Sequence, residues 1–64
     1  MPTPLDELPS ISAPARRALH NAGYPTLRQL ANVPRQKLAE LHGMGPKALA
    51  VLEEALAEHG LQLS

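Results

Sequence analysis

The fold is decided by the stretch LAELHGMGPKALAVL, residues 38–52. An apolar helix end, with Leu38 and Leu41, leads into Gly43-Met44-Gly45 and then directly into a new helix at Pro46. Proline suits a first helical position because its missing N–H would have no partner there. The glycines permit backbone angles closed to other residues and allow another molecule to approach the main chain. The stretch therefore predicts two helices joined by a tight hairpin, with Met44 pointing inward to fix the hairpin to the core.

The start of the second helix of this pair is a predicted anion site. The main-chain N–H groups near Gly45, Lys47 and Ala48 have no acceptor within their own helix, and the positive end of the helix dipole lies beside them. Lys47 adds a positive charge. A DNA phosphate suits such a site because it makes no demand on base identity. The alternative is that Gly43-Met44-Gly45 only connects two helices and that Lys47 is only solvated.

Helix signals recur along the rest of the chain. Ser12 is predicted to cap a helix that ends at Gly23, and Thr26 to cap a short helix that breaks before Pro34. The last helix carries leucines at helical spacing and stops at Gly60. No strand pattern competes. The sequence therefore predicts an all-α fold, a compact bundle of four to five short helices in a single domain over residues 1–64, with residues 1–7 loosely ordered.

Charge is distributed unevenly along these 64 residues, although the formal net charge is zero. All six Lys and Arg residues lie between Arg16 and Lys47, where Glu40 is the only acid. The middle of the chain is thus a local positive region flanked by acidic ends, which fits contact with a polyanion. The other interpretation is that these charges form the solvated faces of helices.

Composition and spacing argue against several functions. There are no cysteines, and His20, His42 and His59 do not share a metal-ligand spacing, so no metal site is expected. The acids Glu53, Glu54 and Glu58 have no plausible nucleophile near them, so we expect no enzyme, cofactor or small-molecule substrate. No apolar segment is long enough for a membrane span, and no signal peptide is visible.

A near-repeat appears at a shift of 33 residues. Apolar residues match apolar ones and small residues match small ones when two sets are aligned: Leu5, Leu8, Ser10, Ile11, Ser12, Ala15 and Leu19 with Leu38, Leu41, Gly43, Met44, Gly45, Ala48 and Leu52. Chance agreement is possible in a chain rich in Leu and Ala. The alternative is two pseudo-symmetric hairpins that pack together because neither can bury its apolar face alone.

On these residues the chain resembles the helix-hairpin-helix (SAM-like) family, and above all the C-terminal domain of the bacterial RNA polymerase alpha subunit and its stand-alone relatives. The resemblance covers about Leu5 to Leu63. It includes the segments AGYPTLRQLA at 22–31, MGPKAL at 44–49 and GLQL at 60–63. It implies a domain that binds the DNA minor groove through backbone contacts, with a role in transcription in the cytoplasm, at the bacterial nucleoid.

The resemblance also implies which residues contact DNA. Gly45 and Lys47 match positions that touch phosphate, and Ala48 retains the N–H of a hydroxyl-bearing position. Pro14 stands where the family has its groove-entering arginine, so a preference for A·T-rich grooves is not expected.

The predicted DNA-contacting residues are completed by positions before and within the first helix. Arg17 falls on a position that faces DNA in the family, and Arg16 and Arg17 together could replace the missing arginine. Ser12 can offer its hydroxyl to phosphate or act only as a helix cap. The full set is Gly43, Gly45, Lys47, Ala48, Arg16, Arg17 and Ser12. A second interpretation makes the chain a protein-interaction module, which requires an exposed patch of Leu or Tyr24.

Overall fold

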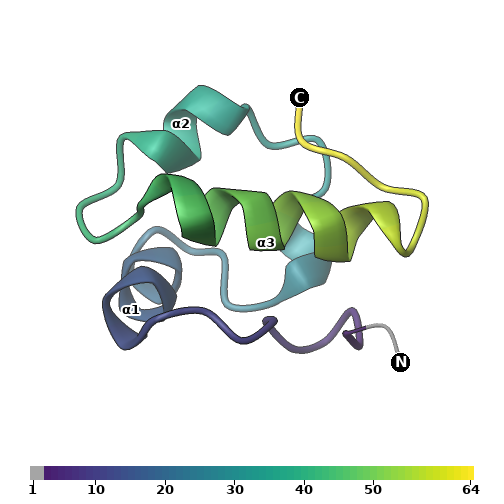
Figure 1. The fold of residues 1–64 in the computed structure, drawn as a ribbon, viewed down its shortest axis with the longest axis horizontal. Coiled ribbons are helices and arrows are strands. Elements are labelled where there is room, and N and C mark those ends of the chain that lie inside the picture. Colours follow the sequence, from purple (N-terminus) through teal and green to yellow (C-terminus); the bar gives the residue numbers. More distant parts are fainter. Residues whose placement is uncertain (1–2) are drawn as a thin grey trace.

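The computed structural model describes residues 3–64, and these residues form only helices, turns and extended segments. In chain order they are α1 (Ala13–Asn21), the 3-10 helix η1 (Leu27–Leu30), α2 (Arg35–Ala39) and α3 (Pro46–Ala57). The longest helix, α3, crosses the middle of the molecule between α1 and α2 (Figure 1). The all-α prediction is confirmed, with four short helices when η1 is counted.

Two helices begin and end where local sequence signals place them. The Ser12 Oγ accepts a hydrogen bond from the Ala15 N–H at the start of α1, with an N···O distance of 3.3 Å. Gly23 follows α1 with φ +90°, and Gly60 follows α3 with φ +72°. Since this left-handed region favours glycine, each helix is terminated at the predicted residue.

Thr26 is the N-cap residue of η1, as predicted, but its side chain does not cap the helix. The Thr26 side chain makes no capping hydrogen bond, and η1 is a single 3-10 turn. The Arg28 N–H donates instead to the Leu5 carbonyl, and the Gln29 N–H donates to the Thr26 carbonyl (N···O 2.9 and 3.2 Å). The groups that a threonine cap would serve are therefore already satisfied, one of them by a segment distant in sequence.

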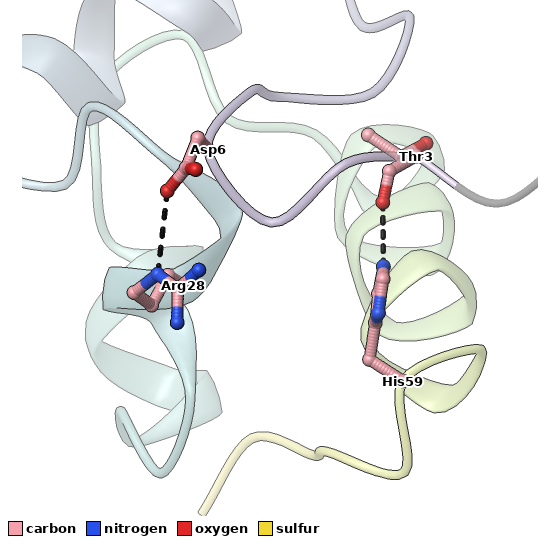
Figure 2. A network of polar contacts seen from close by, with 4 residues as sticks. All are labelled: Thr3, Asp6, Arg28 and His59. Carbon is pink, nitrogen blue, oxygen red and sulfur yellow. Dashed lines mark hydrogen bonds and ion pairs between the residues drawn. The ribbon is translucent and has the colours of Figure 1, made fainter.

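Residues 3–7, for which the sequence predicts loose order, make several contacts with the rest of the fold. The Leu27 N–H donates to the Glu7 carbonyl (N···O 3.0 Å). Figure 2 shows two further contacts, an ion pair between Asp6 and Arg28 and a hydrogen bond between the His59 ring and the Thr3 carbonyl. This segment is tethered by partners far along the chain, which local sequence does not reveal. Met1 and Pro2, the rest of the expected loose segment, lie outside the described residues.

The core consists almost entirely of leucine. Met44 and Tyr24 are half-buried and pack against it, which confirms the inward orientation predicted for Met44. Burying one such leucine contributes roughly 1.5–3 kcal/mol, so these side chains dominate the stability of a small domain. The fully buried side chains are Leu19, Leu27, Leu30, Leu38, Leu52 and Leu56. None of the helices described here is long and apolar enough to cross a membrane.

Gly43 brings the hairpin into direct contact with the start of α1. Its φ is +95°, and a Cβ built on it would lie 2.8 Å from the Pro14 carbonyl oxygen. Real Cβ atoms do not approach a backbone oxygen so closely, so the two backbones can touch only if residue 43 has no side chain. This contact places the start of α3 beside the start of α1.

We expect Gly43→Ala to lower the free energy of unfolding more than Gly23→Ala does. Both glycines have φ near +90°, so each alanine carries backbone strain of about 1–2 kcal/mol. Only Gly43 adds a clash, since nothing lies within 4 Å of a Cβ at Gly23. Urea unfolding of both variants measures the difference, and equal losses would show that the Pro14 contact does not constrain the fold.

Candidate nucleic-acid interface

The first turn of α3 has main-chain donors without protein acceptors. Gly45 is the N-cap residue, with extended angles (φ −108°, ψ 170°) and no side chain to cap the helix. The Leu49 N–H donates to the Gly45 carbonyl (N···O 3.1 Å). Within residues 3–64, the N–H groups of Lys47 and Ala48 have no hydrogen-bond partner. These are the donors for which the sequence predicts an anion.

A groove of about 430 Å³ lies over this turn. One wall is the loop before α1 and the other is the hairpin with the first turns of α3. The floor is apolar, from Ile11, Ala48 and Val51, and Lys47 supplies the charge. The lining residues are Ser10, Ile11, Ser12, Gly43, Gly45, Lys47, Ala48 and Val51. The structure thus gathers five of the seven predicted contact residues around one groove: Ser12, Gly43, Gly45, Lys47 and Ala48.

The two helix starts at this groove differ in how their donors are satisfied. At the start of α1 the Ser12 hydroxyl accepts from the Ala15 N–H. At the start of α3 the corresponding position is Gly45, which has no hydroxyl, so the Ala48 N–H is not capped. The predicted structural role of Ser12 is therefore present, and the uncapped helix is α3.

Arg16 and Arg17 lie in different places although they are neighbours in sequence. Arg17 lines a depression of about 250 Å³ that also includes His42 and Gly43, so it lies next to the groove. Arg16 lines another depression, of about 260 Å³, together with Glu7 and His20. Of the two predicted arginines, the structure brings only Arg17 to the hairpin.

Two ion pairs neutralise part of the positive charge in the middle of the chain. Arg28 pairs with Asp6 (Nε···Oδ1 3.3 Å) and Arg35 pairs with Glu53 (Nε···Oε1 3.2 Å). Both pairs are exposed, and such pairs contribute at most about 1 kcal/mol to stability. In the described part of the chain, Arg16, Arg17, Lys37 and Lys47 form no ion pair.

The charges on α3 oppose its own dipole. Its first turn has no acid and contains Lys47, while its last turn has no base and Glu54 and Glu58 lie toward that end. Each such charge is unfavourable by a few tenths of a kcal/mol or more at the surface. An anion bound at the first turn would offset the unfavourable position of Lys47.

The near-repeat is matched by structure only in its second part. Ser12 and Gly45 are both N-cap residues with extended angles, and Leu19 and Leu52 are both fully buried. Leu38 belongs to α2, but its counterpart Leu5 lies in a turn rather than a helix. Two loop-and-helix units therefore face each other across the groove, but the first unit lacks the leading helix of a full hairpin.

Ile11 and Val51 in the groove and Asn21 in the Arg17 depression were not predicted from sequence. Ile11 and Val51 look like ordinary helix-packing residues, and Asn21 looks like a helix end. Their positions depend on how α1 packs beside the hairpin, so no local signal could have found them. No group of three or more His, Asp or Glu side chains within residues 3–64 is arranged to hold a metal ion.

The comparison with known proteins finds a similar segment in a DNA helicase. Over 56 residues, 88% of this chain, the sequence is 39% identical to the ATP-dependent DNA helicase Hel308 of Pyrococcus horikoshii. The chain spans about 7% of the length of that helicase. No family model and no solved structure matches the chain.

We expect the two helix starts to differ in amide hydrogen exchange. The Lys47 and Ala48 amides should exchange at nearly unprotected rates, because neither N–H has a hydrogen-bond acceptor within residues 3–64. The Ala15 amide should be slowed by its bond to Ser12. Ser12→Ala should remove this protection and lower the free energy of unfolding by about 1 kcal/mol. Strong protection at Lys47 and Ala48 would contradict the open donor site.

Proposed function

We propose that this chain is a non-enzymatic DNA-binding module that contacts backbone phosphates through the hairpin and the first turn of α3. The proposal is carried by one observation: the Lys47 and Ala48 N–H groups have no acceptor within residues 3–64, and both residues line an accessible groove. A helix start with free donors is a ready anion site. The similarity to a DNA helicase supports DNA as the source of that anion.

The expected binding is weak and largely independent of sequence. Main-chain donors and one lysine contact phosphate oxygens, which are the same at every step of the duplex. A few such contacts correspond to dissociation constants on the order of 10⁻⁴ to 10⁻⁶ M, with strong salt dependence. The resemblance to the polymerase domain extends the proposal to the minor-groove side of DNA, to transcription and to the bacterial nucleoid.

The zero net charge, the acidic ends and Pro14 in place of the groove-entering arginine favour the interaction-module alternative. That interpretation needs an exposed patch of Leu or Tyr24. Every leucine in the described residues is buried or half-buried, and Tyr24 is half-buried against the core. The exposed apolar residues of the helices are alanines such as Ala50 and Ala57.

A titration of a short duplex into labelled protein tests the proposal directly. At low salt the amide signals of Gly45, Lys47 and Ala48 should shift, and the shifts should shrink as salt rises. Lys47→Gln should weaken binding to all sequences alike and reduce the salt slope by about 1. Lys37→Gln is the matched control, because Lys37 is exposed on α2 and does not line the groove. Unchanged amides at low salt would contradict the proposal.

We expect Gly45→Ser to raise the stability of the fold and to weaken DNA binding. A serine hydroxyl at this N-cap position can accept from the Ala48 N–H, as Ser12 does for Ala15 at the start of α1. The variant should therefore be more stable by a few tenths of a kcal/mol and should bind duplex DNA more weakly. Thermal unfolding and anisotropy titration measure the two effects. A gain in stability with unchanged binding would show that the Ala48 donor does not contact phosphate.

A further inference from the structure

The depression that contains Arg17 lies between α1 and the hairpin. Its polar side chains come from three places: Arg17 within α1, Asn21 at the end of α1, and His42 in the turn before Gly43. All three residues are exposed. The complete lining is Pro14, Arg17, Ala18, Asn21, His42 and Gly43, and it includes no acid.

This depression adjoins the groove at the start of α3. Gly43 lines both spaces. Its contact with the Pro14 carbonyl fixes the hairpin against α1 at this point. A chain molecule that occupies both the groove and the depression would therefore run past Gly43.

The side chains of the depression are suited to an oxyanion. Arg17 carries a permanent charge and five N–H donors, and no acid pairs with it within residues 3–64. The His42 imidazole has an N–H donor even when neutral, and the Asn21 amide has two. None of the three forms a side-chain hydrogen bond in the described part of the chain.

We propose that this depression is a second phosphate subsite, in which Arg17, Asn21 and His42 hold the phosphate that follows the one at the start of α3 on the same DNA strand. The inference rests on the proposed function, because a continuous strand is what links the two sites. Main-chain donors and Lys47 hold one phosphate, and side-chain donors hold the next. The pair fixes the path of the strand over Gly43.

The opposite side of α1 provides a matched control. The other depression also contains one arginine and one histidine, Arg16 and His20, but Glu7 lines it as well. A carboxylate there repels phosphate. The double variants Arg17→Gln/His42→Gln and Arg16→Gln/His20→Gln have the same composition and net charge, and they differ only in which depression loses its donors.

Anisotropy titrations of a short fluorescein-labelled duplex, at about 50 and 200 mM salt, compare the two double variants. Arg17→Gln/His42→Gln should weaken binding about tenfold at the lower salt and reduce the salt slope by about 0.9, the loss of one phosphate contact. Arg16→Gln/His20→Gln should stay within about twofold of the wild type, contrary to the sequence prediction for Arg16, because the structure places Arg16 beside Glu7 and away from the hairpin. Equal losses in both variants would show a diffuse charge effect and overturn the subsite.

Two further measurements distinguish failure of the second subsite from failure of the proposed function. If Lys47→Gln weakens binding while the two double variants bind alike, the second subsite is wrong and the proposed function stands. If Lys47→Gln also has no effect, the proposed function itself fails. In the wild-type protein, DNA should shift the side-chain signals of Asn21 and His42 but not those of His20. This readout needs no substitution, and unmoved Asn21 and His42 signals would overturn the subsite.

Discussion

The close contact between Gly43 and the Pro14 carbonyl is the constraint on which the rest of this structure depends. It requires a residue that has no Cβ and can adopt φ +95°. With that contact in place, the hairpin lies against the start of α1, and the first turns of α1 and α3 meet at one groove. The leucine core holds the helices together, but it does not by itself determine that two helix starts face the same space. This one backbone contact sets that arrangement.

The two helix starts differ in whether their first amides are satisfied within the chain. Serine at position 12 uses its hydroxyl to satisfy an amide of α1, which stabilises that helix. Glycine at position 45 leaves the amides of α3 to solvent, and Lys47 and the C-terminal acids of α3 have the sign that the helix dipole disfavours. These features lower the free energy of unfolding of a domain whose small size already makes it only marginally stable. They are consistent with an external anion at α3 and unnecessary for folding.

Local signals in the sequence predict much of this fold, because they act over a few residues. The serine cap, the terminating glycines at 23 and 60, Pro46 at the start of α3 and the inward Met44 all follow from neighbouring residues. The failures concern partners distant in sequence. Thr26 is the N-cap residue of η1 without a capping side chain, because Leu5 satisfies the donor at Arg28, and the contacts of residues 3–7 come from η1 and His59. The same reason explains the site: the hairpin donors were predictable, and helix geometry alone separates Arg16 from Arg17, whereas the places of Ile11, Val51 and Asn21 arise only when α1 packs.

A formal net charge of zero therefore says little about what this molecule can bind. Asp6 and Glu53 pair with Arg28 and Arg35, so part of the positive segment is neutralised in the folded chain. Glu7 shares a depression with Arg16, whereas no acid lines the spaces on either side of Gly43. The fold thus determines which charged groups lie together, and the net charge of the chain does not reveal this. At physiological salt the range of an exposed charge is about 8 Å, so a phosphate at the hairpin responds mainly to the groups that line these two spaces and much less to the charge of the whole chain.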